Sequence, residues 1–136
     1  MIRNIGAALA GLITAFVLIY LIEMLGHSIY PPPPDLDFSD PEAMRPYVAS
    51  LPPLALLFPM FAWFIGTFAG TLVASFIGTA KPILFAAVVG IFILAGTIAN
   101  MIVIPHPLWF AVVALIGIAA SAWLAMLVAP TPVAED

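Results

Sequence analysis

Four long runs of apolar residues divide the chain, and short polar or proline-rich segments separate them. The runs cover approximately residues 5–29, 54–77, 82–104 and 108–129. Each holds about 22–25 residues, which as an α-helix is about 33–38 Å long and crosses the hydrocarbon core of a bilayer. Backbone polar groups in lipid must be satisfied within the segment, so we expect four helices. The pattern predicts an all-α fold, an integral membrane four-helix bundle that forms a single membrane domain over residues 1–136.

The segment between the first two runs, about residues 30–53, predicts a loop outside the membrane that contains a short helix. The run Pro31–Pro34 ends the first helix because proline lacks an amide N–H and clashes with the preceding turn. Farther on, Ser39 or Asp40 can cap a new helix whose first turn holds Pro41. The apolar residues that follow have helical spacing. We therefore expect an amphipathic helix over about residues 41–50, lying on the membrane surface.

Composition agrees with a membrane protein. Hydrophobic residues make up 65% of the chain and charged residues 7%, with a mean hydropathy of +1.23. A soluble domain has roughly 25% charged residues. The absence of cysteine excludes disulfides and thiolate chemistry. No basic patch is present, so we expect the lipid bilayer and no nucleic acid as a partner.

The few basic residues predict the orientation. Arg3 and Lys81 flank the membrane spans on one side, whereas Arg45 lies on the other side in a loop with four acids. Basic residues favour the cytoplasmic side. We therefore expect a bacterial cytoplasmic membrane protein with cytoplasmic N- and C-termini and an outer loop at residues 30–53. The first run exceeds the 7–15 residues typical of a signal-peptide core, so we expect a retained span.

Small residues recur at every fourth position of the second run. The stripe consists of Ala62, Gly66, Gly70, Ala74 and Gly78. Such stripes allow helix backbones to approach closely in lipid. The sequence leaves two uses open, which are packing within the bundle and an interface in a homo-oligomer or a larger membrane complex.

Four polar residues stand out in the apolar sequence. Glu23 and His27 are four residues apart and share one helix face near the end of the first run. His106 lies in the turn between the last two runs, and Asn100 precedes that turn. Ionisable side chains inside a membrane usually face the bundle interior and find partners there. We therefore predict a polar cluster at the outer rim of the bundle.

Several chemistries fit this cluster. Glu23 and His27 could form a structural hydrogen-bonded pair at the helix end. Glu23, His27 and His106 could bind zinc or iron, although the second histidine of the His-Glu-x-x-His motif is absent. The two histidines could hold a haem. Glu23 could be a proton-coupled site, and the cluster could bind a quinone or a lipid headgroup.

No motif for an enzyme or a cofactor is present. The chain lacks a Gly-x-Ser-x-Gly nucleophile elbow, a phosphate-binding glycine loop and a dinucleotide fingerprint. The sequence thus favours a non-catalytic protein without a cofactor.

Parts of the sequence resemble a group of small, uncharacterised bacterial membrane proteins with four spans. The similar residues are those from Glu23 to Pro34, from Asp40 to Ala43 and from Ile104 to Trp109, together with Leu51, Pro52 and Trp63. The resemblance implies four spans and implies no activity. Small multidrug transporters also have four short helices and a glutamate in the first. Here the glutamate is near the outer end and the outer loop is long and acidic, which argues against drug–proton exchange.

These observations lead to one functional hypothesis and its alternatives. We expect a non-catalytic accessory or assembly subunit, or a homo-oligomer, packed through small-residue helix faces. The alternatives are a small carrier or channel that uses Glu23 as a proton or cation site, and a Glu/His metal site at the outer rim.

Overall fold

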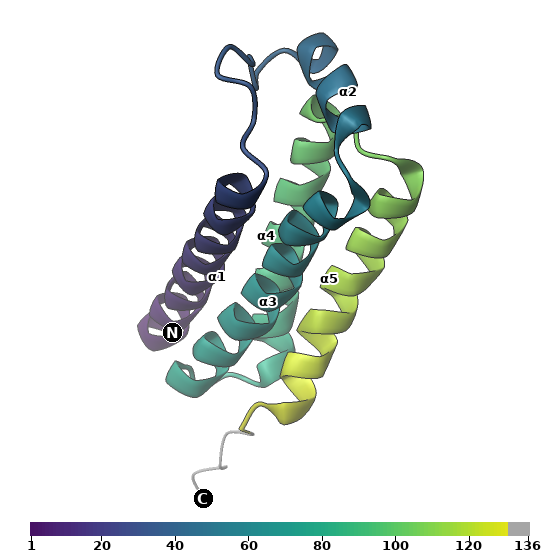
Figure 1. Cartoon of the computed structure of the whole chain (residues 1–136). Helices are drawn as coiled ribbons and strands as arrows, with labels where there is room; N and C mark the ends of the chain where they lie inside the picture. Colours follow the sequence, from purple (N-terminus) through teal and green to yellow (C-terminus); the bar gives the residue numbers. More distant parts are fainter. Residues whose placement is uncertain (131–136) are drawn as a thin grey trace, which may run out of the picture.

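The computed structural model describes residues 1–130, and these residues form five helices with no strand (Figure 1). The helices are α1 (Ile2–Ile29), α2 (Pro41–Ser50), α3 (Pro53–Ile77), α4 (Pro82–Val103) and α5 (Leu108–Val128). All except α2 are long and apolar enough to cross a membrane. The predicted all-α fold, with four membrane spans and a short helix in the first loop, is confirmed.

Local sequence explains where these helices begin. The Asp40 side chain accepts a hydrogen bond of 2.9 Å from the backbone N–H of Glu42, and Pro41 occupies the first helical position. Pro53 and Pro82 also stand in first turns, where the missing N–H costs nothing. Helix α1 begins at Ile2, three residues earlier than predicted. No proline or glycine interrupts the helix at Ile2, Arg3 or Asn4.

Helix α3 occupies the centre of the bundle. It packs against α1, α4 and α5, whereas α1 packs mainly against α3 and lies at the edge, away from α5 (Figure 1). The most apolar stretch of α3 is 44% buried within the chain, against 17% for that of α1. Helix α2 lies over one end of the bundle, which we call the loop end. The α4–α5 turn reaches the same end.

Helix α2 is more than a surface helix, because two of its side chains enter the core. Met44 and Val48 are buried and belong to the same hydrophobic cluster as Leu56, Trp63 and Phe110. The amphipathic face of α2 therefore packs onto the bundle itself and closes its loop end.

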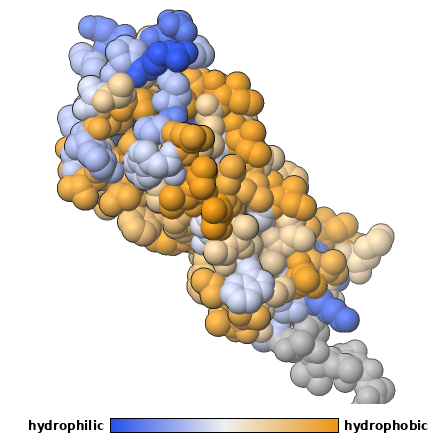
Figure 2. Space-filling model, turned by 90° about the vertical axis from the view of Figure 1, so that its right-hand side faces the viewer, coloured by the Kyte–Doolittle hydropathy of each residue, from blue (hydrophilic) through white to orange (hydrophobic). Residues whose placement is uncertain are grey.

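The outer surface of the four long helices is largely hydrophobic. Figure 2 shows a broad apolar zone through the middle of the molecule, with hydrophilic residues gathered at the loop end. Large exposed side chains such as Leu9, Phe92 and Ile116 contribute to this zone. Such a surface requires lipid or protein around it. The chain is therefore an integral membrane protein.

The small-residue stripe of α3 packs within the chain. Ala62, Gly66, Gly70 and Ala74 are buried, and Gly78 is half-buried. A Cβ added to Gly70 would lie 2.5 Å from the Gly11 carbonyl oxygen and 2.9 Å from the Ala15 Cβ. These distances show that α1 and α3 approach each other backbone to backbone. Of the two uses left open by the sequence, the stripe serves internal packing.

Hydrogen bonds hold the start of α1 to the α3–α4 turn at the other end of the bundle. Arg3 Nε donates to the Ile77 carbonyl at 2.7 Å. The Asn4 side-chain oxygen accepts from the backbone N–H groups of Thr79 at 2.7 Å and Ala80 at 3.1 Å. The start of α1 and the end of α5 lie at this same end, opposite the loop end (Figure 1).

Candidate functional site

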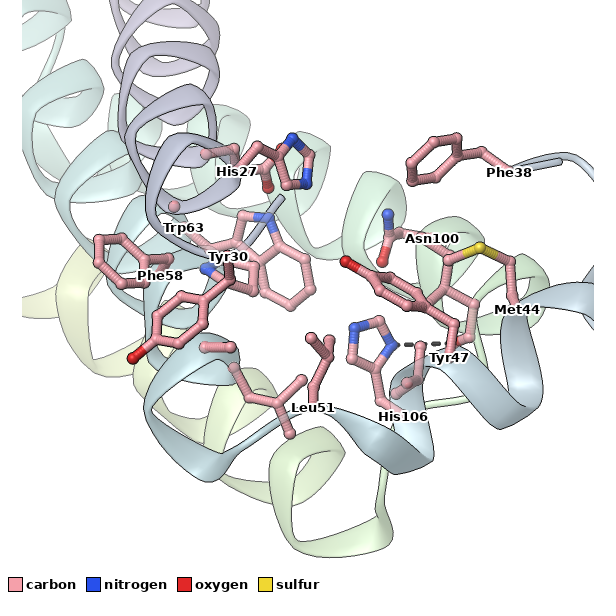
Figure 3. Close-up of a pocket in the computed structure, with 17 residues that line it drawn as sticks. His27, Tyr30, Phe38, Met44, Tyr47, Leu51, Phe58, Trp63, Asn100 and His106 are labelled. Atoms are coloured by element: carbon pink, nitrogen blue, oxygen red, sulfur yellow. Dashed lines mark hydrogen bonds between the residues drawn. The ribbon is translucent and has the colours of Figure 1, made fainter. Parts of the chain in front are cut away.

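A pocket of about 140 Å³ lies at the loop end of the bundle, and we call it the loop-end pocket. Residues of α1, α2, α3, α4, the segment between α1 and α2, and the α4–α5 turn line it (Figure 3). All four members of the predicted polar cluster, Glu23, His27, Asn100 and His106, are on its wall. The structure thus brings together residues that are more than 80 positions apart in the sequence.

Close packing of α1 on α3 positions Glu23 and His27. Gly26, between them, is buried, and a Cβ added there would lie 2.8 Å from the Phe58 Cβ. This contact turns the Glu23 face of α1 toward α3, where Trp63 lies. Glu23 is half-buried, whereas His27 is exposed and its ring centroid lies 6.4 Å from that of Phe38. His27 therefore occupies the rim of the pocket.

Aromatic side chains and a backbone carbonyl fix His106. Its ring stacks on Phe110 with centroids 4.4 Å apart and an interplanar angle of 12°, and it meets the Trp63 ring edge-on at 6.3 Å. His106 Nδ1 is 2.8 Å from the Ile104 carbonyl oxygen. A carbonyl can only accept, so Nδ1 carries the proton of this bond.

Burial lowers the pKa of His106, and the hydrogen bond to Ile104 opposes part of that shift. The ring is therefore neutral near pH 7, and its Nε2 is a hydrogen-bond acceptor. In Figure 3 this second nitrogen points into the pocket. The turn thus presents an acceptor to the pocket.

Two further acceptors occur in pocket-lining segments. The Asn100 Oδ1 atom is buried and has no hydrogen-bond partner among the described residues. Pro59 has no N–H, so α3 lacks the bond that this residue would otherwise donate to the Ala55 carbonyl. Ala55 and Pro59 both line the pocket. An unpaired buried acceptor such as Asn100 Oδ1 is costly, which indicates that this part of the wall suits a molecule with hydrogen-bond donors.

The four polar residues converge without bonding to one another. No hydrogen bond joins any two of Glu23, His27, Asn100 and His106, and no ion pair within 4.0 Å joins Glu23 to either histidine. The Glu23–His27 hydrogen bond considered from the sequence is not formed. Within residues 1–130, no three His, Asp or Glu side chains are arranged to hold a metal ion. The geometry therefore gives no support to the metal alternative.

Acidic residues lie in and beside the pocket, and Lys and Arg are absent from its lining. Glu23 is its one acidic residue, and none of the chain's three Lys and Arg residues lines it. Arg3 and Lys81 are at the opposite end, and Arg45 pairs with Glu42 at 3.4 Å. The loop beside the pocket adds four acids, Asp35, Asp37, Asp40 and Glu42. Hydrogen bonds from Ser39 lower the pKa of Asp37, which keeps it ionised.

Sequence reasoning missed the aromatic half of the site. Trp63 is 5% exposed and forms a wall between α1 and the α4–α5 turn, and Tyr47 reaches the pocket from α2. Figure 3 shows the Tyr47 ring beside Asn100 and His106. The apolar residues with helical spacing that predict an amphipathic helix over residues 41–50 include Met44, Tyr47 and Val48, and these three side chains lie on one face of α2 toward the pocket. The pattern does not specify that this face packs on the bundle.

No family model, curated protein or solved structure shows significant similarity to this chain.

Proposed function

We propose that this integral membrane protein is non-catalytic and works as an accessory or assembly subunit of a larger membrane complex, or as a homo-oligomer. The peripheral position of α1 supports this proposal, because one side of α1 packs on α3 and the other faces outward. The small-residue stripe of α3 is buried within the chain. Association therefore uses the outward face of α1.

Tyr20 is the observation that carries the proposal. It is 63% exposed on α1, and no described residue hydrogen-bonds to its hydroxyl. Tyr20 is ten residues before Tyr30, so it lies about 15 Å along the helix from the loop end. A hydroxyl that faces hydrocarbon at this depth lacks a partner and costs free energy. A second protein chain on this face would supply an acceptor.

Photocrosslinking in native membranes tests this proposal. We expect p-benzoylphenylalanine at Tyr20 to give a discrete crosslinked product. The same group at Ile116, which is 65% exposed on α5, is the matched control and should give none. Tyr20→Phe, which removes only the hydroxyl, should weaken association in mild detergent. A monomeric particle that shows no crosslink from Tyr20 would contradict the proposal.

We also propose that the host membrane is a bacterial cytoplasmic membrane with both termini in the cytoplasm. The positions of Arg3 and Lys81 at the end opposite the loop support this orientation. The resemblance to small bacterial four-span proteins stays a prediction.

The alternative of a small carrier or channel has one specific observation in its favour. Glu23 lines the loop-end pocket and has no Lys or Arg beside it. A membrane carboxyl group without a Lys or Arg partner is suited to a mobile proton or cation.

A further inference from the structure

We propose that the loop-end pocket is a binding site for a primary ammonium group, carried by a free amine or by the headgroup of an amine-bearing lipid. This site does not depend on the accessory role proposed above. It deepens the carrier alternative by naming the class of ligand, and it requires binding alone, without transport.

The charge of the pocket selects a cation. Glu23 provides a carboxyl group in a half-buried position, with no Lys or Arg beside it and with the exposed His27 one turn farther along α1. The adjacent loop carries four acids against Arg45 alone, so its field attracts cations toward this end of the molecule. A phosphate or carboxylate group inside the pocket would meet Glu23 and no Lys or Arg. Charge complementarity thus favours a ligand whose ammonium group enters the pocket while any phosphate stays outside it.

The hydrogen-bonding groups of the pocket select a donor. The Glu23 carboxylate, the unpaired Asn100 Oδ1 and the His106 Nε2 are all acceptors. They come from three different segments, α1, α4 and the α4–α5 turn, and Figure 3 shows Asn100 and His106 near each other beside Tyr47. An ammonium group has three N–H donors and no acceptor. It matches this set better than a metal ion, for which no ligand cluster is present in residues 1–130.

Aromatic rings supply the remaining walls. Trp63 is buried beside His106, and Tyr47 lines the pocket from α2. Faces of Trp and Tyr attract ammonium groups by about 0.5–2 kcal/mol, more strongly when the site excludes water. The volume of about 140 Å³ is close to that of a cavity that holds benzene. The pocket therefore admits a short alkylammonium group.

An apolar groove next to the pocket gives an amine-bearing lipid a second contact. Ile22, Ile29, Leu54 and Ile65 are among the residues that line it, and it shares Tyr30 and Phe58 with the loop-end pocket. An ammonium headgroup in the pocket would leave an acyl chain next to this groove. A free amine would use the pocket alone.

Intrinsic fluorescence of the full chain in nanodiscs of phosphatidylcholine tests the site. In a Trp109→Phe, Trp123→Phe background, Trp63 is the remaining tryptophan and reports on the pocket. We expect propylammonium to change this fluorescence saturably, and 1-propanol, its neutral counterpart, to have no such effect. Equal responses to propylammonium and 1-propanol would overturn the proposal.

Substitutions of pocket residues test whether propylammonium binds in the loop-end pocket. Glu23→Gln and Asn100→Leu should each weaken propylammonium binding, the former by about tenfold or more because it removes a charged hydrogen bond. Glu42→Gln is the matched control, since Glu42 is an exposed acid outside the pocket, and it should bind normally. If Glu23→Gln does not fold, propylammonium binding by Asn100→Leu tests the site. Unchanged binding by the folded pocket variants contradicts the site.

Nanodiscs that contain phosphatidylethanolamine distinguish the two sources of the ammonium group. A lipid headgroup that occupies the pocket would compete with propylammonium and raise its apparent Kd relative to phosphatidylcholine discs. An unchanged Kd would assign the site to free amines. If propylammonium binds but no crosslink forms from Tyr20, the ammonium site is upheld and the accessory role is rejected. The two proposals can therefore fail independently of each other.

Discussion

At the scale of single residues, His106 makes a pH-dependent contribution to stability. Burial holds its pKa below the ordinary value of 6.5, so the unfolded chain binds the proton more tightly than the folded chain. The contribution to stability is complete above pH 6.5 and is lost as the pH falls through the lower pKa of the folded state. The other titratable residues that line the same pocket are Glu23, His27, Tyr30 and Tyr47.

Thermal unfolding in detergent at pH 8 and pH 5 tests this contribution. The wild-type protein should lose stability on acidification, and His106→Gln should lose less because its side chain does not titrate. His27→Gln is the matched control, because that ring is exposed at the rim. If the wild type and His106→Gln lose the same stability between the two pH values, the assignment of a buried neutral ring is wrong.

The convergence of the polar residues was predictable in part. Spacing of four placed Glu23 and His27 on one helix face, and an even number of spans placed His106 at the same end. Which side chains complete the pocket was not predictable. The positions of Trp63 and Tyr47 depend on helix order and on how α2 folds over the bundle. Tertiary packing determines both, and periodicity within a helix does not.

At the scale of helices, close contact between α1 and α3 depends on glycine. The Gly70 backbone lies so near Gly11 that any side chain there would separate the two helices. We expect Gly70→Ala to destabilise the fold by roughly 1–3 kcal/mol through overpacking, and Gly70→Leu to destabilise it more. The fraction folded can be followed by circular dichroism during titration with dodecyl sulfate.

Gly96 of α4 is the matched control for this substitution. It is exposed, and no atom lies within 4 Å of a Cβ added to it. Gly96→Ala should be neutral or should stabilise α4 by about 0.5–1 kcal/mol through helix propensity. Equal effects of alanine at positions 70 and 96 would show that helix propensity, rather than the α1–α3 contact, determines the outcome.

The boundaries of the helices were largely readable from the sequence. Proline and the Asp40 cap mark the beginnings of α2, α3 and α4, and the predicted range of α2 agrees with the structure. The apolar run places the start of α1 at about residue 5, whereas the helix begins at Ile2. Hydropathy locates the part of a helix in lipid. Arg3 and Asn4 extend α1 beyond that part and contact the α3–α4 turn.

At the scale of the whole molecule, the two ends of the bundle differ in charge, and this difference predicts the orientation. The end that holds the start of α1 carries Arg3 and Lys81, whereas the loop end carries four acids and Arg45. Two basic residues against one favour a cytoplasmic position for the end that holds the start of α1. The acidic loop end, with its pocket, would then face the periplasm and meet amines from outside the cell.

Reporter fusions test this orientation directly. A periplasm-dependent phosphatase fused after Asp37, in the loop, should be active in a bacterial host. The same reporter fused after Asp136, which lies outside the described residues, should be inactive, because four spans return the chain to its starting side. Lys81→Glu with Arg3→Glu should weaken this preference, since it removes the basic residues that favour the cytoplasm. Arg45→Gln is the control and should leave the orientation unchanged. Phosphatase activity from the Asp136 fusion would reverse the orientation and place the loop-end pocket in the cytoplasm.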